Sequence, residues 1–234
     1  MSIEIVDPVE EEPEEEEPRR RWRAVILSVV VLVLIAGGLA YWRYRDTHRP
    51  AEIAAPASAT ADGGQLVLGT GPVVVEIYVD FMCPVCKELE TNTNPMLMKF
   101  VQQNRIRLIW HPVTYHNGAS SPVGYSERAA SSVACAGDYG KAYPYGDALL
   151  YYLPAGGGPG LSDDQLIDIA GNAGIITPAF AQCVRTKKYA AWVNQGTQAA
   201  VKRGVTLVPT MFVNGRMLPE LSLPAIEAAI VAGR

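Results

Sequence analysis

The sequence predicts an α/β fold that is interrupted by an all-helical insertion and preceded by a single transmembrane helix. Three observations lead to this fold class. An uncharged segment of about 19 residues lies near the N-terminus. Short runs rich in Val, Ile and Tyr then alternate with a helical pattern up to residue 113. A further stretch of about 80 residues, helical in pattern, separates these runs from one more strand.

The charge of the chain is unevenly distributed. Residues 1–18 hold nine acidic residues and no Lys or Arg, so we expect residues 1–23 to form a disordered acidic cytoplasmic tail. From Pro50 onward, 13 basic residues stand against 14 acidic ones. This part of the chain is close to neutral and shows no basic stripe of the kind found in nucleic-acid-binding proteins. We therefore expect no nucleic-acid partner.

Residues 24–42 predict the transmembrane helix, because a helix needs roughly 20 apolar residues to cross a bilayer. Aromatic residues flank this segment, as is typical of a lipid–water boundary: Trp22, Tyr41, Trp42 and Tyr44. Four arginines precede the segment and three follow it, which favours a cytoplasmic N-terminus. A cleaved signal peptide is the alternative, but its apolar region is usually only about 7–15 residues long. We therefore expect an uncleaved anchor.

Residues 43–64 are rich in Ala, Pro and small residues and predict a flexible linker. With this topology, the domain of residues 65–234 lies outside the cytoplasm, where cysteines tend to be oxidised. All four cysteines of the chain lie in this domain: Cys83, Cys86, Cys135 and Cys183. Their even number favours two disulfides over a metal site.

The first half of the domain predicts two strands, a helix and a strand. Residues 65–70 and 73–81 are the first strands, and the second is nearly apolar throughout, as a central strand should be. Residues 83–103 predict a helix, in which Pro95 should cause a kink or a break. Residues 105–113 predict the next strand.

The helical insertion is expected at about residues 120–204. Ser126 is a candidate N-cap of its first helix, and Ser162 with Gln165 predicts a capping box. Residues 177–204 predict one long helix that ends at Gly204.

The chain should end in a hairpin and a helix. A strand at residues 210–213 leads into a turn at Asn214-Gly215, across which a short strand at 216–218 should pair. Residues 222–234 predict the last helix.

The segment DFMCPVCKELE, residues 80–90, carries the strongest chemical signal. Its two cysteines stand where a strand meets a helix, and a helix N-terminus favours a thiolate. A lowered pKa would make Cys83 both a nucleophile and a good leaving group, while Pro84 suits the first helical turn. We expect an exposed Cys83 to react first and a more buried Cys86 to act second.

A metal site is the alternative to a redox pair. It would need two further ligands, yet the other cysteines lie far away and form no second C-x-x-C, and the chain has three histidines. We therefore expect no metal and no cofactor other than the Cys83–Cys86 disulfide.

Two acidic residues precede the pair. By strand parity, Glu76 and Asp80 share one face with Tyr78. A buried acid near the resolving cysteine could shuttle its proton. The other interpretation, which we favour, is that Asp80 caps the turn at Cys83.

A second motif, VPTMFVNG, lies far from the first. By itself, Pro209 could merely begin an edge strand. Together, however, DFMCPVC and VPTMFVNG resemble the active-site motif and the cis-proline loop of the thioredoxin superfamily. The long helical insertion resembles the DsbA-like thiol–disulfide oxidoreductases, especially the membrane-anchored bacterial branch, and the resemblance covers about residues 65–234.

The resemblance implies a thioredoxin fold in which Cys83 attacks and Cys86 resolves. It also implies a cis peptide before Pro209, in a loop with Val208 that offers backbone groups to an extended substrate. The strongest oxidases of the group carry a histidine between the cysteines. Here the dipeptide is Pro84-Val85, so we expect an intermediate reduction potential.

Cys135 and Cys183 have two interpretations. Buried free thiols are common in proteins, but an oxidising compartment favours a bridge. Proteins of the resembling branch often carry such a second bridge, which implies a structural Cys135–Cys183 disulfide.

The function that follows is an oxidoreductase of the bacterial cell membrane that introduces disulfides into reduced or unfolded secreted and envelope proteins. The resemblance implies a DsbB-like or VKOR-like membrane partner that reoxidises it. The alternatives are a reductase or isomerase, since the reduction potential sets the direction, and a redox-inert binding module. No dimerisation domain precedes the catalytic one, which argues against a dimeric isomerase. We expect a monomer.

Overall fold

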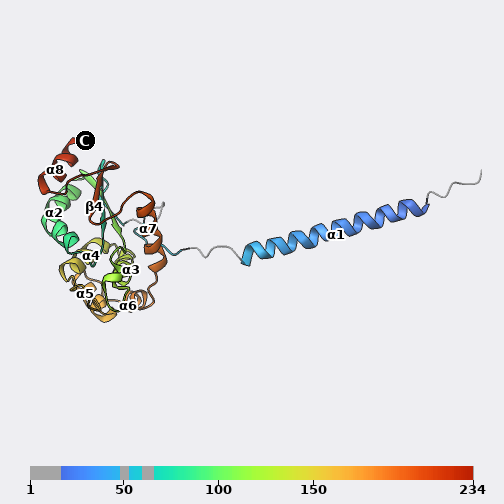
Figure 1. The fold of residues 1–234 in the computed structure, drawn as a ribbon, viewed down its shortest axis with the longest axis horizontal. Coiled ribbons are helices and arrows are strands. Elements are labelled where there is room, and N and C mark those ends of the chain that lie inside the picture. Colours follow the sequence, from blue (N-terminus) through green and yellow to red (C-terminus); the bar gives the residue numbers. More distant parts are fainter. Residues whose placement is uncertain (1–16, 48–52, 60–65, 234) are drawn as a thin grey trace, which may run out of the picture. The chain divides into compact units, whose positions relative to one another are not determined.

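The computed structural model describes residues 17–47, 53–59 and 66–233 and divides the chain into two compact units, residues 1–52 and 53–234 (Figure 1). The described part of the first unit forms one helix, α1, Glu17–Thr47. Within α1, the segment Trp22–Asp46 has a mean hydropathy of 2.7 and is long and apolar enough to cross a membrane. Its large apolar side chains are exposed, as the side chains of a helix that faces lipid would be.

Helix α1 extends beyond both ends of the predicted membrane segment. It begins at Glu17, so residues 17–23, which we expected in the disordered tail, are helical. Pro18 is compatible with this start, because the N–H groups of a first helical turn have no partner in the helix. The other end of α1 reaches Thr47, inside the predicted linker. The remaining parts of the predicted tail and linker, residues 1–16, 48–52 and 60–64, lie outside the described residues.

The second unit is built on a five-stranded sheet with the order β1-β3-β2-β4-β5. Its strands are β1 Leu66–Leu68, β2 Val73–Val79, β3 Ile106–Pro112, β4 Thr210–Val213 and β5 Arg216–Met217. Strands β2 and β3 are parallel, and the other neighbours are antiparallel. The central strand β2 is buried along almost its whole length, which explains its nearly continuous apolar sequence.

Helices cover the sheet on both sides. Helix α2, Pro84–Gln102, connects β2 to β3 and lies on the same side as α8, Leu223–Ala232, while α7, Ala190–Lys202, lies on the other (Figure 1). Pro95 lies inside α2, but the helix continues through it, so the predicted break is absent from this helix.

The insertion between β3 and β4 consists of a short 3₁₀ turn, η1, and five helices. Their bounds are η1 Asn117–Ala119, α3 Tyr125–Gly137, α4 Ala142–Tyr151, α5 Asp163–Asn172, α6 Pro178–Arg185 and α7 Ala190–Lys202. The capping box of Ser162 and Gln165 forms at the start of α5. The predicted single helix at 177–204 is wrong, because Lys187 adopts a left-handed conformation with φ 49° and separates α6 from α7.

A disulfide and a buried indole hold the insertion together and against the sheet. Cys135 of α3 and Cys183 of α6 are bonded, with their Cα atoms 6.0 Å apart. Trp110 of β3 is fully buried and contacts the ring of Tyr143 on α4, with centroids 5.2 Å apart. Gly146 permits this approach, because a Cβ atom there would lie 2.2 Å from the indole. Helix α4 is thereby fixed next to β3, and so next to the crossover helix α2.

The predicted hairpin is confirmed. Asn214 and Gly215 have φ angles of 47° and 77°, as the two central residues of a type I′ turn require. The Asn214 side chain accepts a hydrogen bond from the Val74 N–H at 2.8 Å and donates one to the Gly233 carbonyl at 2.9 Å. One side chain therefore ties the hairpin to β2 and to the end of α8.

Part of the predicted linker packs on the domain. Pro56 is buried, and the Ala57 N–H donates a hydrogen bond to the Asp138 carboxylate at 3.0 Å. Asp138 also accepts a hydrogen bond from the Tyr189 hydroxyl at 2.6 Å. Ala59 forms an antiparallel bridge with Leu66 of β1. The expectation of a flexible linker is therefore wrong for residues 53–59, because small residues and free backbone groups let this segment pack closely on the insertion.

Candidate active site

Cys83 occupies the N-cap of α2. Its backbone is extended, and its sulfur accepts a hydrogen bond from the Cys86 N–H at 3.1 Å, in the way that a capping oxygen would. Pro84 follows at the first helical position, where no N–H is needed. The strand-to-helix junction predicted from the sequence therefore places Cys83 against the unpaired N–H groups of the helix.

The two thiols have opposite electrostatic environments. The hydrogen bond from the Cys86 thiol lowers the pKa of Cys83, against burial, and backbone hydrogen bonds from Cys86 and Val85 act in the same direction. Burial raises the pKa of Cys86 far above its usual range, and the hydrogen bond with Cys83 adds to the rise. In the reduced pair, the thiolate therefore belongs to Cys83.

The expected exposure of Cys83 is wrong. Cys83 and Cys86 are only 2% and 1% exposed, and the loop before β4 lies against the Cys83 sulfur. The Val208–Pro209 peptide in this loop is cis, and the Cys83 thiol donates a weak hydrogen bond to the Val208 carbonyl at 3.7 Å. A residue 125 positions away thus contacts the sulfur.

Two apolar side chains that lie close in sequence to Cys83 and to the cis peptide are exposed. They are Val85, between the two cysteines, and Leu207, just before the cis peptide.

Asp80 is completely buried beside the two cysteines. Its carboxylate accepts hydrogen bonds from the Met82 N–H at 2.8 Å, the Ser126 hydroxyl at 2.7 Å and the His116 N–H at 2.8 Å. The first of these closes the turn that leads into Cys83, which is the geometry of a cap. Ser126 is not the N-cap of α3, since Gly124 holds that position, and the serine hydroxyl serves Asp80 instead.

Glu76 lies in an ion-pair cluster instead. It accepts hydrogen bonds from both terminal nitrogens of Arg203 and contacts His111 at 3.2 Å. Burial opposes its ionisation, but the hydrogen bonds from Arg203 and His111 outweigh burial and lower the pKa of Glu76 to about 2. A carboxylate paired this firmly stays ionised at neutral pH, so the structure does not support Glu76 as a proton shuttle.

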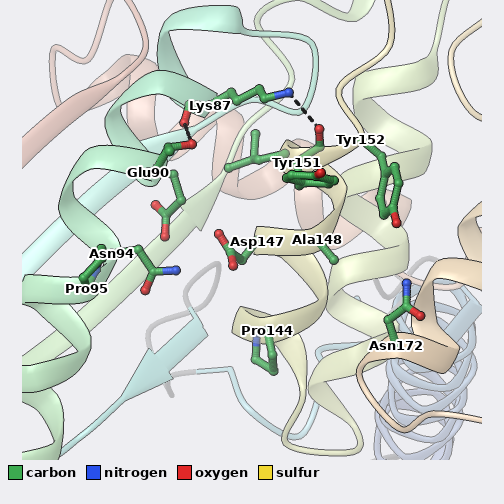
Figure 2. A pocket seen from close by; sticks show the side chains of 12 residues that line it. Lys87, Glu90, Asn94, Pro95, Pro144, Asp147, Ala148, Tyr151, Tyr152 and Asn172 are labelled. Carbon is green, nitrogen blue, oxygen red and sulfur yellow. Dashed lines mark hydrogen bonds between the residues drawn. The ribbon is translucent and has the colours of Figure 1, made fainter.

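Sequence reasoning missed Glu90, another buried acid, on helix α2. Glu90 follows Cys86 by four residues, a spacing that places two side chains on one helix face and that could have revealed it. It accepts a hydrogen bond from the Tyr143 hydroxyl, and burial raises its pKa to about 7. Figure 2 shows Glu90 with Asp147 and Asn94 in a cavity of about 410 Å³ between α2 and α4.

Glu90→Gln is expected to remove a pH dependence of stability. A glutamate in the unfolded chain titrates at its ordinary value of 4.5, whereas folded Glu90 titrates at about 7. The folded state therefore binds the proton more tightly, and stability falls as the pH rises from 4.5 to 7, by about 3 kcal/mol at most. Glutamine does not ionise and can still accept the Tyr143 hydrogen bond. The variant should match the parent at pH 4.5 and exceed its stability at pH 8 by about 2–3 kcal/mol.

Urea unfolding of the parent and the variant at these two pH values measures the effect. Glu88→Gln, an exposed change on the same helix, is the matched control and should leave the pH dependence in place. Equal loss of stability between pH 4.5 and 8 in the Glu90→Gln protein and the parent would contradict the assignment.

No group of three or more His, Cys, Asp or Glu side chains suited to hold a metal ion occurs in the described part of the chain.

Comparisons with known proteins agree with this geometry. The model of a family described as thioredoxin matches residues 63–231. The structure of the reduced disulfide bond oxidoreductase DsbG from Mycobacterium tuberculosis is similar, with 26% sequence identity and a TM-score of 0.61, over 75% of this chain and 85% of that one. Reduced DsbA from the same organism has 23% identity and a TM-score of 0.58, over 76% and 98% of the two chains. Oxidised BdbD from Bacillus subtilis has 21% identity and a TM-score of 0.65, over 78% and 98%.

The curated relatives are longer proteins. The Na⁺/H⁺ antiporter NhaA 3 of Salinispora tropica is 25% identical over 162 residues, which are 69% of this chain and 23% of that protein. NhaA 1 of Salinispora arenicola is 26% identical over the same lengths. The chain thus spans less than a quarter of each. The solved structures and the family model confirm the predicted α/β fold and its likeness to DsbA-type proteins.

Proposed function

Since this chain belongs to the thioredoxin family, we propose that it is a DsbA-type thiol–disulfide oxidoreductase that introduces disulfide bonds into secreted or envelope proteins. The observation that carries the proposal is the opposite electrostatic environment of its two cysteines at the start of α2. Cys83 is built to exist as a thiolate and Cys86 as a thiol, as exchange chemistry on a C-x-x-C pair requires.

The reaction begins with the oxidised pair. A substrate thiolate attacks the Cys83 sulfur, the Cys83–Cys86 bond breaks, and Cys86 leaves as a thiolate that takes up a proton. The substrate is then bound to Cys83 by a mixed disulfide. A second substrate thiolate attacks the substrate sulfur of this bond, forms the substrate disulfide and releases Cys83 as a thiolate. Two electrons pass from the substrate dithiol to the protein.

The stabilised Cys83 thiolate supplies the driving force. Any interaction that favours the thiolate favours the reduced protein, and this makes the disulfide form a stronger oxidant. The dipeptide Pro84-Val85 has no side-chain donor for that sulfur, which depends on Cys86 and on backbone groups. This supports an intermediate potential.

The cis-proline loop supports binding of an extended protein segment. The Val208 carbonyl lies beside the reactive sulfur, and a backbone acceptor there could pair with a substrate N–H. The exposed Val85 and Leu207 offer apolar contacts of little specificity. Unfolded or reduced secreted proteins are therefore the proposed substrates.

The setting of the reaction is the outer side of a bacterial cell membrane. Helix α1 would be the single-pass anchor, with a cytoplasmic N-terminus. The Cys135–Cys183 disulfide supports an oxidising compartment. A DsbB-like or VKOR-like membrane protein would reoxidise Cys83 and Cys86, and the protein would act as a monomer.

The full-length chain is expected to restore disulfide formation in a bacterium that lacks its own extracytoplasmic disulfide oxidase. The readout is the activity of an exported reporter enzyme that needs a disulfide, and the Cys83→Ala chain is the control. Restoration requires both the proposed orientation and the proposed direction of exchange.

The reduction potential of the purified protein separates the alternatives. A value between about −120 and −180 mV is expected of an oxidase, whereas a value near −270 mV, together with failed restoration, would indicate a reductase. Isomerase activity would appear as rearrangement of a scrambled substrate without net oxidation. A protein that exchanges no disulfides would instead be a binding module.

A further inference from the structure

A polar cluster behind the redox pair contains a histidine that the exchange chemistry does not use. His116 follows β3 and precedes η1, and its backbone N–H donates to the Asp80 carboxylate at 2.8 Å. Its ring nitrogen Nδ1 lies 3.6 Å from the same carboxylate. The side chain is 40% exposed, whereas Asp80 is fully buried. The ring therefore links a buried carboxylate to solvent.

The Nδ1–carboxylate contact depends on the charge of the ring. A separation of 3.6 Å is too long for a good hydrogen bond but short enough for an ion pair. Among the described residues, the buried Nδ1 atom of His116 has no hydrogen-bond partner. A neutral imidazole consequently gains little at this distance, whereas an imidazolium ion would pair with the Asp80 carboxylate.

The other groups that donate hydrogen bonds to Asp80 carry no charge. The Met82 N–H and the Ser126 hydroxyl are neutral donors. Tyr125 of α3 stays a neutral phenol, because burial raises its pKa. Arg128, the nearby cation of α3, pairs with Asp163 at 3.0 Å. Histidine is the side chain whose charge ordinarily changes between pH 5 and 8.

The charge of Asp80 acts on both sulfurs. It raises the pKa of Cys83 and of Cys86, although it is not the largest influence on either thiol. A positive charge placed against Asp80 would partly cancel this effect. The Cys83 thiolate would then be easier to form, and the reduced protein would be more stable relative to the disulfide form.

We propose that His116 is a positioning residue of the redox pair: its imidazolium form neutralises Asp80 and stabilises the Cys83 thiolate in acidic surroundings. The inference rests on the proposed function of Cys83 and Cys86 and adds a regulation to it. An extracytoplasmic protein is exposed to the pH of its surroundings. As that pH falls, the contact between His116 and Asp80 would preserve the Cys83 thiolate, and with it the oxidising power of the disulfide form.

Two substitutions at His116 test the proposal. His116→Asn removes the titratable ring and His116→Lys supplies a constant positive charge, while both keep the backbone N–H that binds Asp80. The rate at which iodoacetamide alkylates Cys83, and the exchange equilibrium with glutathione, are measured between pH 5 and 8 in the full chain. At pH 5.5 the Asn variant should react about three- to tenfold more slowly than the parent, and at pH 8 the two should match. The Lys variant should equal or exceed the parent across the range.

Ser126→Ala is the matched control, because it removes a neutral donor from the same carboxylate. It should change the rates at all pH values by one factor and keep the parent's ratio between pH 5.5 and pH 8. Parallel profiles of the parent and the Asn variant would overturn the proposal. The alkylation rate is defined whether or not the protein oxidises substrates, so failure of this inference is distinct from failure of the proposed function.

Discussion

Cys86→Ala is expected to accumulate disulfide-linked adducts with substrate proteins, whereas Cys83→Ala should form none. In the Cys86→Ala protein, Cys83 keeps its place at the N-cap of α2 and can still form a mixed disulfide, but no internal thiol remains to resolve it. In the Cys83→Ala protein, the remaining sulfur is buried and its pKa is strongly raised. Oxidase activity should fall by several orders of magnitude in both.

Non-reducing gels of the full-length variants from cell envelopes measure the adducts, which dithiothreitol should abolish. The same adducts should form in a Cys86→Ala/Cys135→Ala/Cys183→Ala protein, which would exclude the second pair of cysteines as their source. The roles of Cys83 and Cys86 would be reversed if alkylation of the reduced parent at mildly acidic pH labelled Cys86 first.

Loss of the second disulfide is expected to lower stability and spare the chemistry. The Cys135–Cys183 bridge closes a separation of 48 residues between α3 and α6. By the chain-entropy model, its removal in Cys135→Ala/Cys183→Ala should cost about 3–4 kcal/mol, because the unfolded chain regains the freedom that the bridge removed. Unfolding in urea under non-reducing conditions measures the loss.

Exchange activity should stay near that of the parent, since neither Cys135 nor Cys183 contacts Cys83 or Cys86 in any hydrogen bond or disulfide of the described structure. Peptide mapping of protein taken from the cell envelope provides an independent check. Finding both residues as free thiols there would refute a structural bridge.

Local signals in the sequence were sufficient for most elements. The apolar run at residues 73–79, the capping box at Ser162 and the Asn214-Gly215 turn each formed as predicted. Each of these signals acts within one strand or one turn, so neighbouring residues determine the outcome. The N-cap at Cys83 is also a local feature, because the Cys83 sulfur accepts a hydrogen bond from an N–H only three residues away.

Predictions from local sequence were wrong where the chain packs on segments that are distant in the sequence. Serine is a residue type that often caps helices, but the Ser126 hydroxyl donates a hydrogen bond to Asp80, 46 residues earlier. Residues 53–59 have the composition of a linker, but Asp138 and β1 fix them to the domain. The break between α6 and α7 at Lys187 depends on a single residue in a left-handed conformation, which a helical pattern does not reveal.

The sequence alone predicted the C-x-x-C pair at a strand-to-helix junction, the positions of the strands along the chain and the apolar N-terminal segment, since spacing and composition carry these features. The tertiary structure alone assigned the carboxylates. Glu76 and Asp80 are equivalent by strand parity, yet Arg203, 127 residues away, pairs with the first, while Ser126 and His116 donate to the second. Glutamate is usually a surface residue, but Glu90 is buried and accepts a hydrogen bond from the Tyr143 hydroxyl. The ionisation of a buried acid depends on the donors and charges that surround it, and in a folded chain those groups come from segments far apart in the sequence.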